Sequence, residues 1–592
     1  MQTAPADPGG RTRKPPMLTT QYLLEAFREE GISHVFLVPG GLIDPFLPAL
    51  SDCPGLTPIV AGHEGGAACM ADGYARAGGR FGVCFAIGGP GITNMVTAVA
   101  AARTDFSPIM VISGQVPTDW EGRGGFQDSS PAALNDIGVF QPITISSLMV
   151  SNLHLVHHHL RASLTKMLAG ARGPVHISLP TDIQRQEVQA PWVKLDESLY
   201  SPRFVDRHGV ERLWRVLAPA DGTPAPVRIV ALAGAGVEKS GGTCDLVAFA
   251  ERFEIPVATT LRAKGVFPED HRLSLGIFGY AGHRQAIDTI LSDDVEVLLV
   301  LGSGLSQRDT LFWDRRMLPS RALVQVDIDL QVIGRTWPVQ VPIVGDCARV
   351  LQVVTSYEYS LTQALESSNA QRRAWLESVR AAGPRYYEAE NTASDAVPLH
   401  PARVITELRR TAPRDTVLVV DSGAHRAFCG HYWEAYEPRS YISATNLGPM
   451  GWAIPAGIGA KAARPEKPLV VVTGDGCMLM HGMEVQTAAR YGIAAIFVVI
   501  NNGALGNVWL RAVKEGPGPA ALTEIPVHDW AGFARSLGMK AATVHKPEEL
   551  APAFQQALEA KAPYLIDVRC DRAFTTPVTP YSQAKQEWVD DD

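Results

Sequence analysis

Oxygen-bearing side chains and glycines are concentrated at the ends of two apolar runs between residues 468 and 506. Gly474-Asp475-Gly476 ends the first run, and Asn501-Asn502 ends the second. A carboxylate and an amide oxygen suit Mg²⁺, which usually keeps some waters and takes further oxygens from bound phosphates. The backbone N–H groups of Gly476 and Cys477, at the start of a predicted helix, would bind the phosphate groups of the same ligand, such as a diphosphate. The alternative interpretation of Gly-Asp-Gly is a tight turn followed by a solvated loop.

The two apolar runs and the helix between them are the elements that must position these groups. Residues 469–473 and 494–500 have the pattern of buried strands, and the segment between them has a helical pattern. Two such strands joined by a helix form a βαβ unit in a parallel sheet. Both strands then end at the same edge, which is where open α/β sheets bind ligands. The pattern therefore predicts that Asp475 and Asn502 lie close together.

A second carboxylate that could take part in chemistry is Glu64, at the end of a predicted strand. It opens a helix whose next residues, 65–71, are mostly small and allow close approach of another backbone. A glutamate in the first turn of a helix often interacts only with the helix dipole or caps the helix. If it is buried, it must hydrogen-bond a partner to be tolerated, and a bound cofactor can be that partner.

These motifs together resemble those of a known enzyme family. Gly-Asp-Gly followed at this spacing by Asn-Asn resembles the thiamine-diphosphate signature of the decarboxylase and carboligase superfamily. The segment GHEGGAACMADGYARA (62–77) resembles that family's catalytic-glutamate motif, and GGPGITN (88–94) resembles its glycine-rich partner. The resemblance covers roughly residues 17–570 and implies an enzyme that uses thiamine diphosphate and Mg²⁺.

The resemblance also implies roles for single residues. The family's metal ligands, an aspartate, the second asparagine and a backbone carbonyl two residues further on, correspond here to Asp475, Asn502 and Ala504. Glu64 would protonate the aminopyrimidine ring of the cofactor, so that the neighbouring imino group can deprotonate the thiazolium carbon. The positions that match cofactor-binding residues are Gly423, Ala424, His425, Met450, Gly474, Gly476, Cys477 and Asn502. Met450 would support the folded cofactor, which is compatible with ordinary core packing.

The loop Gly124–Asp128 contains a further catalytic candidate, Gln127. It resembles the loop in which acetolactate-synthase-like members carry an active-site glutamine. Pyruvate-decarboxylase-type members place a histidine pair nearby, and this sequence has none there. The side chain of Gln127 is a neutral hydrogen-bond donor that suits a substrate carbonyl, and a plain surface loop is the alternative.

Length and composition set the class of protein. At 592 residues the chain is too long for one core, and about three or four domains are expected. A net charge of −8 argues against nucleic acid as a partner, and no apolar run reaches the roughly 20 residues that span a membrane. Residues 1–16 lack an apolar core and are predicted to be a disordered tail instead of a secretory signal. Eight scattered cysteines without a C-x-x-C pair indicate a reducing compartment, so we expect a cytoplasmic protein.

Short β-rich runs alternate with helical stretches along most of the chain, which predicts an α/β fold. We expect three Rossmann-like parallel-sheet domains, and the resemblance implies that they are a pyrimidine-binding, a central and a diphosphate-binding domain. The predicted segments are domains at 17–190, 206–357 and 396–570, a helical linker at 358–395, and a tail or lid at 571–592.

The central domain has a weak nucleotide-binding signal, the turn Gly234-Ala235-Gly236 after a predicted strand. Such turns are common in any α/β sheet, so the turn alone does not identify a ligand. The central domain of related enzymes holds FAD in some members, ADP in CoA-processing members and nothing in others. The sequence leaves these three alternatives open.

Three functions are compatible with the sequence. The first is an acetolactate-synthase-like carboligase or decarboxylase of 2-keto acids. The second is a lyase or decarboxylase of the 2-hydroxyacyl-CoA or oxalyl-CoA type, with ADP in the central domain. The third is a non-enzymatic paralogue, which intact Glu64, Asp475 and Asn502 disfavour. In this superfamily the glutamate and the metal ligands come from different subunits, so the resemblance implies a homodimer or homotetramer with active sites at the subunit interface.

The sequence departs from acetolactate synthases at three positions, and the first two of these contact the acceptor substrate in that group. Gly304 stands where the group has an arginine, Arg511 where it has a tryptophan, and Ile145 where a lysine is expected shortly after Pro142. An arginine can bind a carboxylate with two parallel hydrogen bonds, and glycine cannot replace it. We therefore expect an acceptor other than the 2-keto acids of branched-chain biosynthesis.

Overall fold

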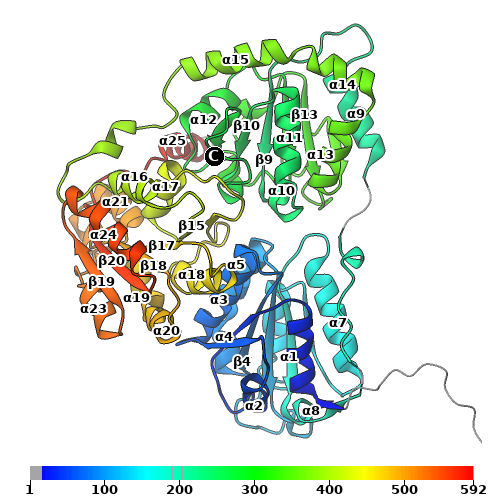
Figure 1. Ribbon diagram of the computed structural model, residues 1–592, viewed down its shortest axis with the longest axis vertical. Helices are drawn as coiled ribbons and strands as arrows, with labels where there is room; N and C mark the ends of the chain where they lie inside the picture. The colour runs from blue at the N-terminus through cyan, green and yellow to red at the C-terminus, as the bar shows by residue number, and fades with distance from the viewer. Residues whose placement is uncertain (1–15, 190, 202–204, 591–592) are drawn as a thin grey trace, which may run out of the picture.

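The computed structural model describes residues 16–189, 191–201 and 205–590, and most of the predicted disordered tail lies outside these ranges. The described chain contains three six-stranded sheets, in each of which all neighbouring strands are parallel (Figure 1). The prediction of three α/β parallel-sheet domains is confirmed. No helix within the described ranges is long and apolar enough to cross a membrane.

The first sheet lies in the N-terminal part of the chain. Its strand order is β3 (Thr57–Val60), β2 (His34–Leu37), β4 (Gly82–Ile87), β5 (Ile109–Gln115), β7 (Val175–Pro180) and β6 (Ser146–Met149). The flanking helices include α1 (Thr19–Glu29), α3 (Glu64–Ala77), α4 (Pro90–Asn94), α5 (Val96–Thr104) and α7 (Leu155–Leu168).

The central sheet has the order β11 (Ser274–Ile277), β10 (Val257–Thr259), β9 (Ile229–Ala233), β12 (Val297–Leu301), β13 (Ala322–Asp327) and β14 (Val341–Val344). Its helices include α9 (Arg207–Leu217), α10 (Ala235–Lys239), α11 (Thr243–Phe253), α12 (Arg284–Ile290) and α13 (Cys347–Ser356). The segment 358–395 contains α14 (Tyr359–Glu366) and α15 (Asn369–Ala381), and Leu365 and Leu376 from these helices are buried in the central core.

The third sheet has the order β16 (Tyr441–Ile442), β15 (Val417–Val420), β17 (Leu469–Gly474), β18 (Ile496–Asn501), β20 (Tyr564–Arg569) and β19 (Lys540–Val544). Its helices include α16 (Pro401–Thr411), α17 (Ala424–Tyr432), α18 (Ala453–Ala463), α19 (Asp475–His481), α20 (Val485–Tyr491), α21 (Gly506–Glu515), α23 (Trp530–Ser536) and α24 (Pro547–Glu559). The tail beyond it forms α25 (Thr579–Asp590), which packs through Ala584 on the central core.

The predicted βαβ unit is present at the centre of the third sheet. Strands β17 and β18 are parallel, and Gly474 pairs with Ile500 at their carboxyl ends. Every residue of both strands is buried, as expected for a sheet covered by helices on both faces. The alternative interpretation placed Gly474-Asp475-Gly476 in a tight turn followed by a loop. In the structure, Asp475 is instead the first residue of helix α19.

The N-terminal and C-terminal domains are joined by a close crossing of α3 and α18, which lie side by side (Figure 1). A Cβ atom on Gly73 would lie 2.0 Å from the carbonyl oxygen of Ala456, and one on Gly459 would lie 1.8 Å from that of Met70. Only glycine at these two positions lets the helix backbones touch. The two domains consequently share one continuous buried core.

Candidate functional site

A cavity of about 320 Å³ lies at the carboxyl ends of β15, β17 and β18. It is lined by every residue that the sequence assigned to the metal and the diphosphate: Gly423, Ala424, His425, Met450, Gly474, Asp475, Gly476, Cys477, Asn502 and Ala504. Except for Met450, which lies just before α18, these residues lie at or just after the ends of three strands that are distant in sequence. The parallel arrangement brings them together, because all three strands end at one edge.

Asp475 is the acidic group of this cavity, and only 3% of its surface is exposed. Its Oδ1 atom accepts a hydrogen bond from the N–H of Gly476 at 2.9 Å, and Oδ2 accepts one from the N–H of Gly503 at 2.7 Å. Burial raises the pKa of Asp475, and these N–H groups oppose the rise. No lysine, arginine or histidine side chain in the described part of the chain pairs with this carboxylate. A bound cation would therefore compensate its buried charge.

The oxygen atoms near Asp475 fit a magnesium site. Asn502 lines the same cavity, and its Oδ1 atom accepts a hydrogen bond from the N–H of Ala504 at 3.2 Å. Clusters of three or more histidine, cysteine, aspartate or glutamate side chains that could hold a metal are absent from the described residues. One carboxylate, one amide and a backbone carbonyl would form an incomplete shell, and Mg²⁺ commonly completes such a shell with phosphate oxygens and water.

His425 carries a polar atom that lacks a partner in this cavity. Its Nε2 atom is buried without a hydrogen bond within the described chain. Burial, with a smaller contribution from the charge of Arg426, lowers the pKa of His425 to about 3, so the ring is neutral at pH 7. In the tautomer that carries its proton on Nε2, a neutral imidazole can donate a hydrogen bond to a phosphate oxygen.

Gly476 keeps the cavity open beside Met450. A Cβ atom at Gly476 would lie 2.7 Å from the side chain of Leu505 and 3.1 Å from that of Met450. Any larger residue would therefore push these side chains into the space available to a ligand. Met450 lines the cavity and is only half-buried, which agrees with its predicted contact to a ligand.

Cationic and aromatic side chains also line this cavity, and the sequence singled out only Arg511 of the four described here. Arg308 and Tyr280 reach it from the central domain, and the Arg308 guanidinium lies 4.7 Å from the centroid of the Tyr280 ring. Arg426 follows His425, and burial lowers its pKa. Arg511, from α21, is exposed and forms no ion pair within the described residues. The cavity therefore has the charge pattern of a site for anions.

Glu64 and Gln127 lie together on the N-terminal domain, outside the diphosphate cavity. The Asn94 side chain donates a hydrogen bond to Glu64 Oε2 at 2.9 Å, which links the two motifs of the resemblance. A Cβ atom on Gly91 would lie 3.5 Å from Glu64 Oε1, and one on Gly89 would lie 3.5 Å from Gln127. The glycine-rich loop thus lies between the two predicted catalytic side chains.

A second glutamate, Glu484, holds the backbone just before Glu64. It comes from the C-terminal domain, is buried, and accepts hydrogen bonds from the N–H groups of Gly62 at 3.1 Å and His63 at 3.0 Å. Burial raises its pKa. No local motif marks Glu484 in the sequence, because its role depends on the packing of two domains.

A separate cavity of about 430 Å³, called the central cavity below, lies between the central and N-terminal domains. Gly236 of the G-x-G turn lines it, together with Asp327 and Asp329 at the end of β13. Gly304 also lines this cavity, where the Arg335 side chain donates a hydrogen bond to its carbonyl oxygen at 2.9 Å. Gly304 therefore belongs to the central cavity and does not line the diphosphate cavity.

Comparisons with known proteins agree with this geometry. Models of the thiamine pyrophosphate enzyme family match all three domains: the N-terminal TPP binding domain at residues 17–134, the central domain at 225–354 and the C-terminal TPP binding domain at 421–568. A probable acetolactate synthase large subunit from Methanocaldococcus jannaschii is 33% identical over 95% of this chain and 94% of its own.

Two bacterial relatives are similar over nearly the whole chain. The acetolactate synthase large subunit of Corynebacterium glutamicum is 33% identical over 94% of this chain and 88% of its own. The acetolactate synthase isozyme 3 large subunit of Escherichia coli is 30% identical over 91% and 92%, respectively. The chain therefore belongs to the thiamine pyrophosphate enzyme family, as an acetolactate synthase-like enzyme that depends on thiamine diphosphate.

Proposed function

We propose that this enzyme forms or cleaves a carbon–carbon bond next to the carbonyl of a 2-keto acid, with thiamine diphosphate and Mg²⁺. The observation that carries the proposal is the single cavity that unites Asp475, Asn502 and Ala504 with the glycines and His425. Bound thiamine diphosphate supplies a carbon nucleophile and an electron sink for the bond that breaks. The protein supplies binding, orientation and charge.

The proposed roles follow from the contacts described above. Asp475, the Asn502 amide and the Ala504 carbonyl would hold Mg²⁺, and His425 with the neighbouring backbone would bind the diphosphate. Arg308, Arg426 and Arg511 would attract an anionic substrate to the cavity. Glu64 would exchange a proton with the cofactor, and Gln127 would donate a hydrogen bond to a substrate carbonyl.

The position of Glu64 outside the cavity supports a second proposal, that the active site is shared between two copies of this chain. The exposed surface beside α19 is apolar: Leu479, Met480 and Met483 are 57%, 54% and 57% exposed. The loop that contains Gln127 exposes Trp120 at 51% and Phe126 at 85%. Contiguous exposed apolar side chains mark association surfaces. A homodimer, or a homotetramer built from it, would cover both surfaces and bring Glu64 and Gln127 of one copy to the cavity of the other.

Mixing two inactive variants tests this shared site. Glu64→Gln lacks the proton-exchanging group, and Asp475→Ala lacks a metal ligand. If each site combines Glu64 of one copy with Asp475 of the other, a mixed dimer contains one intact site. Random reassociation then restores about a quarter of wild-type specific activity, because half of the dimers are mixed.

The matched control is a mixture of Asp475→Ala with Asn502→Ala, whose changes lie in the same cavity of one chain. That mixture is expected to stay inactive, because its mixed dimers contain no intact site. Activity that fails to return in the first mixture, while subunit exchange is verified by mass, would place Glu64 and Asp475 in the same copy. The binding of thiamine diphosphate to the Glu64→Gln variant tests the proposed function separately.

For the acceptor, we propose a substrate other than the 2-keto acids of branched-chain biosynthesis. Arg511 lines the cavity in place of a tryptophan, and Gly304 provides no side chain toward any substrate. A lost charge-assisted contact costs about 1.5–3 kcal/mol, or roughly one to two orders of magnitude in acceptor selectivity. Ile145 lines neither the diphosphate cavity nor the central cavity.

Steady-state product analysis with pyruvate tests the acceptor. We expect acetolactate to be a minor product, formed at least about tenfold more slowly than the product of the best acceptor. Arg511→Met is expected to weaken the binding of an anionic acceptor. Lys514→Met changes a residue on the same helix but outside the cavity and is the matched control. Acetolactate as the main product would contradict the proposal.

A specific observation favours the alternative enzyme class, which carries ADP in the central domain. The gap between the central and diphosphate cavities has a volume of about 10 Å³ and is lined by Arg262, Tyr280 and Arg308 among others. This space barely holds one water molecule. ADP would stay in the central cavity and needs no room in this space. The flavin end of FAD would extend into it, so the small volume favours ADP over FAD. A yellow protein with a flavin spectrum would identify FAD, and release of ADP from a colourless protein would support the lyase or oxalyl-CoA decarboxylase type.

A further inference from the structure

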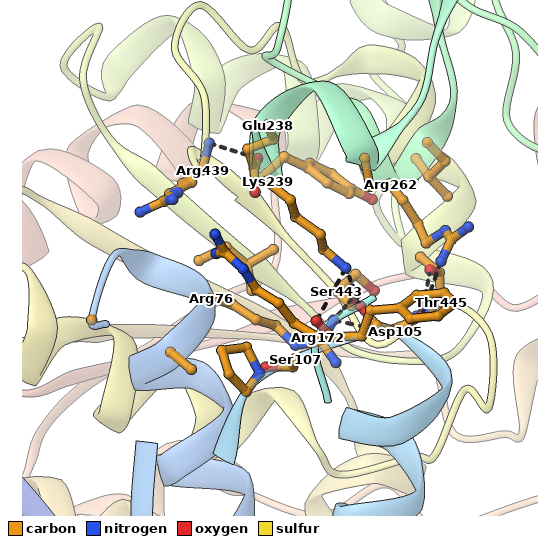
Figure 2. A pocket seen from close by; sticks show the side chains of 18 of the residues that line it. Arg76, Asp105, Ser107, Arg172, Glu238, Lys239, Arg262, Arg439, Ser443 and Thr445 are labelled. Carbon is orange, nitrogen blue, oxygen red and sulfur yellow. Dashed lines mark hydrogen bonds and ion pairs between the residues drawn. The ribbon is translucent and has the colours of Figure 1, made fainter. Parts of the chain in front are cut away.

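A third cavity, of about 90 Å³, lies where the three domains meet (Figure 2). Its lining includes Asp105, Ser107 and Arg172 from the N-terminal domain, Glu238, Lys239 and Arg262 from the central domain, and Arg439, Tyr441 and Ser443 from the C-terminal domain. It shares no lining residue with the diphosphate cavity. The proposed reaction therefore leaves its polar groups unexplained.

Some of the charges in this cavity are balanced by the protein. Arg76 pairs with Asp72 at 2.8 Å and with Asp105 at 3.0 Å. Arg262 lies 3.7 Å from Asp105. Arg80 pairs with a more distant carboxylate, Glu30, at 2.5 Å. These cations have acidic partners and do not require a ligand.

Three other cations in the cavity have no carboxylate within ion-pair distance among the described residues. Arg172, Lys239 and Arg439 form no ion pair within the part of the chain that the structure describes. Lys239 Nζ donates hydrogen bonds only to the backbone oxygens of Asp105 at 2.6 Å and Phe106 at 3.2 Å. Figure 2 shows Lys239 extending toward Asp105. Burial, with a smaller contribution from the charge of Arg262, lowers the pKa of Lys239 to about 7.

One carboxylate in the cavity offsets part of this charge. Glu238 Oε2 accepts a hydrogen bond from the backbone N–H of Arg439 at 3.2 Å, as Figure 2 shows. Burial raises the pKa of Glu238, and the positive charges of Arg439 and Lys239 oppose this rise. Burial also lowers the pKa of Arg172, and the charge of Arg439 adds to that shift. The unpaired groups thus leave an excess of positive charge.

Buried hydroxyl groups in the same cavity also lack partners. Ser107, Tyr441 and Ser443 are 3%, 5% and 8% exposed, and their hydroxyl oxygens have no hydrogen bond within the described residues. Buried polar groups in proteins are nearly always paired. These hydroxyl groups and the cations without ion pairs surround the same space. One kind of ligand would pair with all of them: a group that accepts hydrogen bonds and carries negative charge.

The size and surroundings of the cavity restrict that ligand. Its volume of about 90 Å³, compared with about 430 Å³ for the central cavity, suits a single oxyanion group. The cavity also shares Phe106, Arg172, Lys239 and Arg262 with the larger central cavity. A phosphoryl group can therefore arrive as free phosphate or as the end of a nucleotide in the central cavity.

We propose that the three-domain cavity binds a phosphoryl oxyanion through Arg172, Lys239 and Arg439, with the hydroxyl groups of Ser107 and Ser443 as further donors. Because these five groups come from all three domains, the bound anion ties the three domains together. The site is separate from the diphosphate cavity and does not depend on the proposed reaction.

Titration of the phosphate-free full-length enzyme with inorganic phosphate tests the site by calorimetry and thermal unfolding. We expect saturable binding at one site per chain and a rise in the thermal midpoint with phosphate concentration. Lys239→Met and Arg439→Met are each expected to weaken phosphate binding about 10–100-fold. Lys540→Met, at an exposed position of β19, is the control and should leave phosphate affinity unchanged.

The two sources of the phosphoryl group are distinguished with ADP and adenosine. If the group belongs to a nucleotide, phosphate competes with ADP, and Lys239→Met weakens ADP binding but not adenosine binding. If the anion is free, ADP binds equally well to the variant and phosphate binds alongside it. The proposal would be overturned if the wild type, Lys239→Met and Arg439→Met bound phosphate with equal affinity and also bound ADP with equal affinity. It would also be overturned if the wild type bound neither phosphate nor ADP.

Thermal unfolding without any anion separates a ligand site from a purely structural one. Removal of an uncompensated buried charge in Lys239→Met should leave the thermal midpoint unchanged or raise it. If Lys239 serves only to bind the backbone oxygens of Asp105 and Phe106, the midpoint should fall and phosphate affinity should be unaffected. If Lys239→Met does not fold, phosphate binding by Arg439→Met decides the question, because the Arg439 side chain forms no hydrogen bond or ion pair within the described residues.

Discussion

Replacement of Glu64 by glutamine is expected to lower kcat by about 10²–10⁴-fold, while the affinity for thiamine diphosphate stays nearly unchanged. Glu64 lies outside the diphosphate cavity, so its loss should not disturb binding of the diphosphate. Glutamine can still accept the hydrogen bond that Asn94 donates to Oε2. It cannot release or take up a proton near neutral pH, which is the role that we propose for Glu64.

Measurement of kcat, together with calorimetric titration of the cofactor, checks this expectation. Glu187→Gln is the matched control, because it removes an exposed carboxylate from the same domain. The control should keep wild-type turnover. More than a tenth of wild-type turnover in Glu64→Gln would exclude Glu64 as the proton-exchanging group. Turnover and cofactor affinity that fall together would indicate a binding role instead.

The parts of the site that lie near each other in one domain could be predicted from the sequence. Asp475 and Asn502 end neighbouring parallel strands, and such strands present their carboxyl ends at one edge. Gly423, at the end of β15, joins them for the same reason. The strand pattern also predicted the three sheets, because runs such as Leu469–Gly474 are apolar enough to be buried on both faces.

The parts that depend on how domains pack could not be predicted. Arg308 and Tyr280 line the diphosphate cavity from the central domain, and Glu484 holds the loop before Glu64 from the C-terminal domain. Each is an ordinary residue in its own segment, without a motif or a periodic pattern. The three-domain cavity is the extreme case, because Lys239 and Ser443 become neighbours only through tertiary packing.

Removal of the Asp475 carboxylate is expected to have the largest effect on cofactor binding. Asp475→Ala should lower the affinity for thiamine diphosphate by more than about 100-fold in the presence of Mg²⁺. The remaining affinity should no longer depend on Mg²⁺. The reason is that Asp475 is the one acidic side chain in the lining of the cavity, so without it the diphosphate loses its bridging cation. Titration of thiamine diphosphate with and without Mg²⁺ measures both effects.

Asp475 also stabilises its own strand–helix junction, so the two roles must be separated. Its oxygens accept hydrogen bonds from the N–H groups of Gly476 and Gly503, and alanine would leave both donors unpaired at a cost of about 1–3 kcal/mol each. Asp475→Asn keeps one carbonyl-type acceptor and loses the negative charge. If Asp475 holds the metal, the Asp475→Asn variant should unfold at a higher temperature than Asp475→Ala. Its binding of thiamine diphosphate should nevertheless lose nearly as much of its dependence on Mg²⁺. A variant that binds thiamine diphosphate with unchanged Mg²⁺ dependence would show that the cation is held elsewhere.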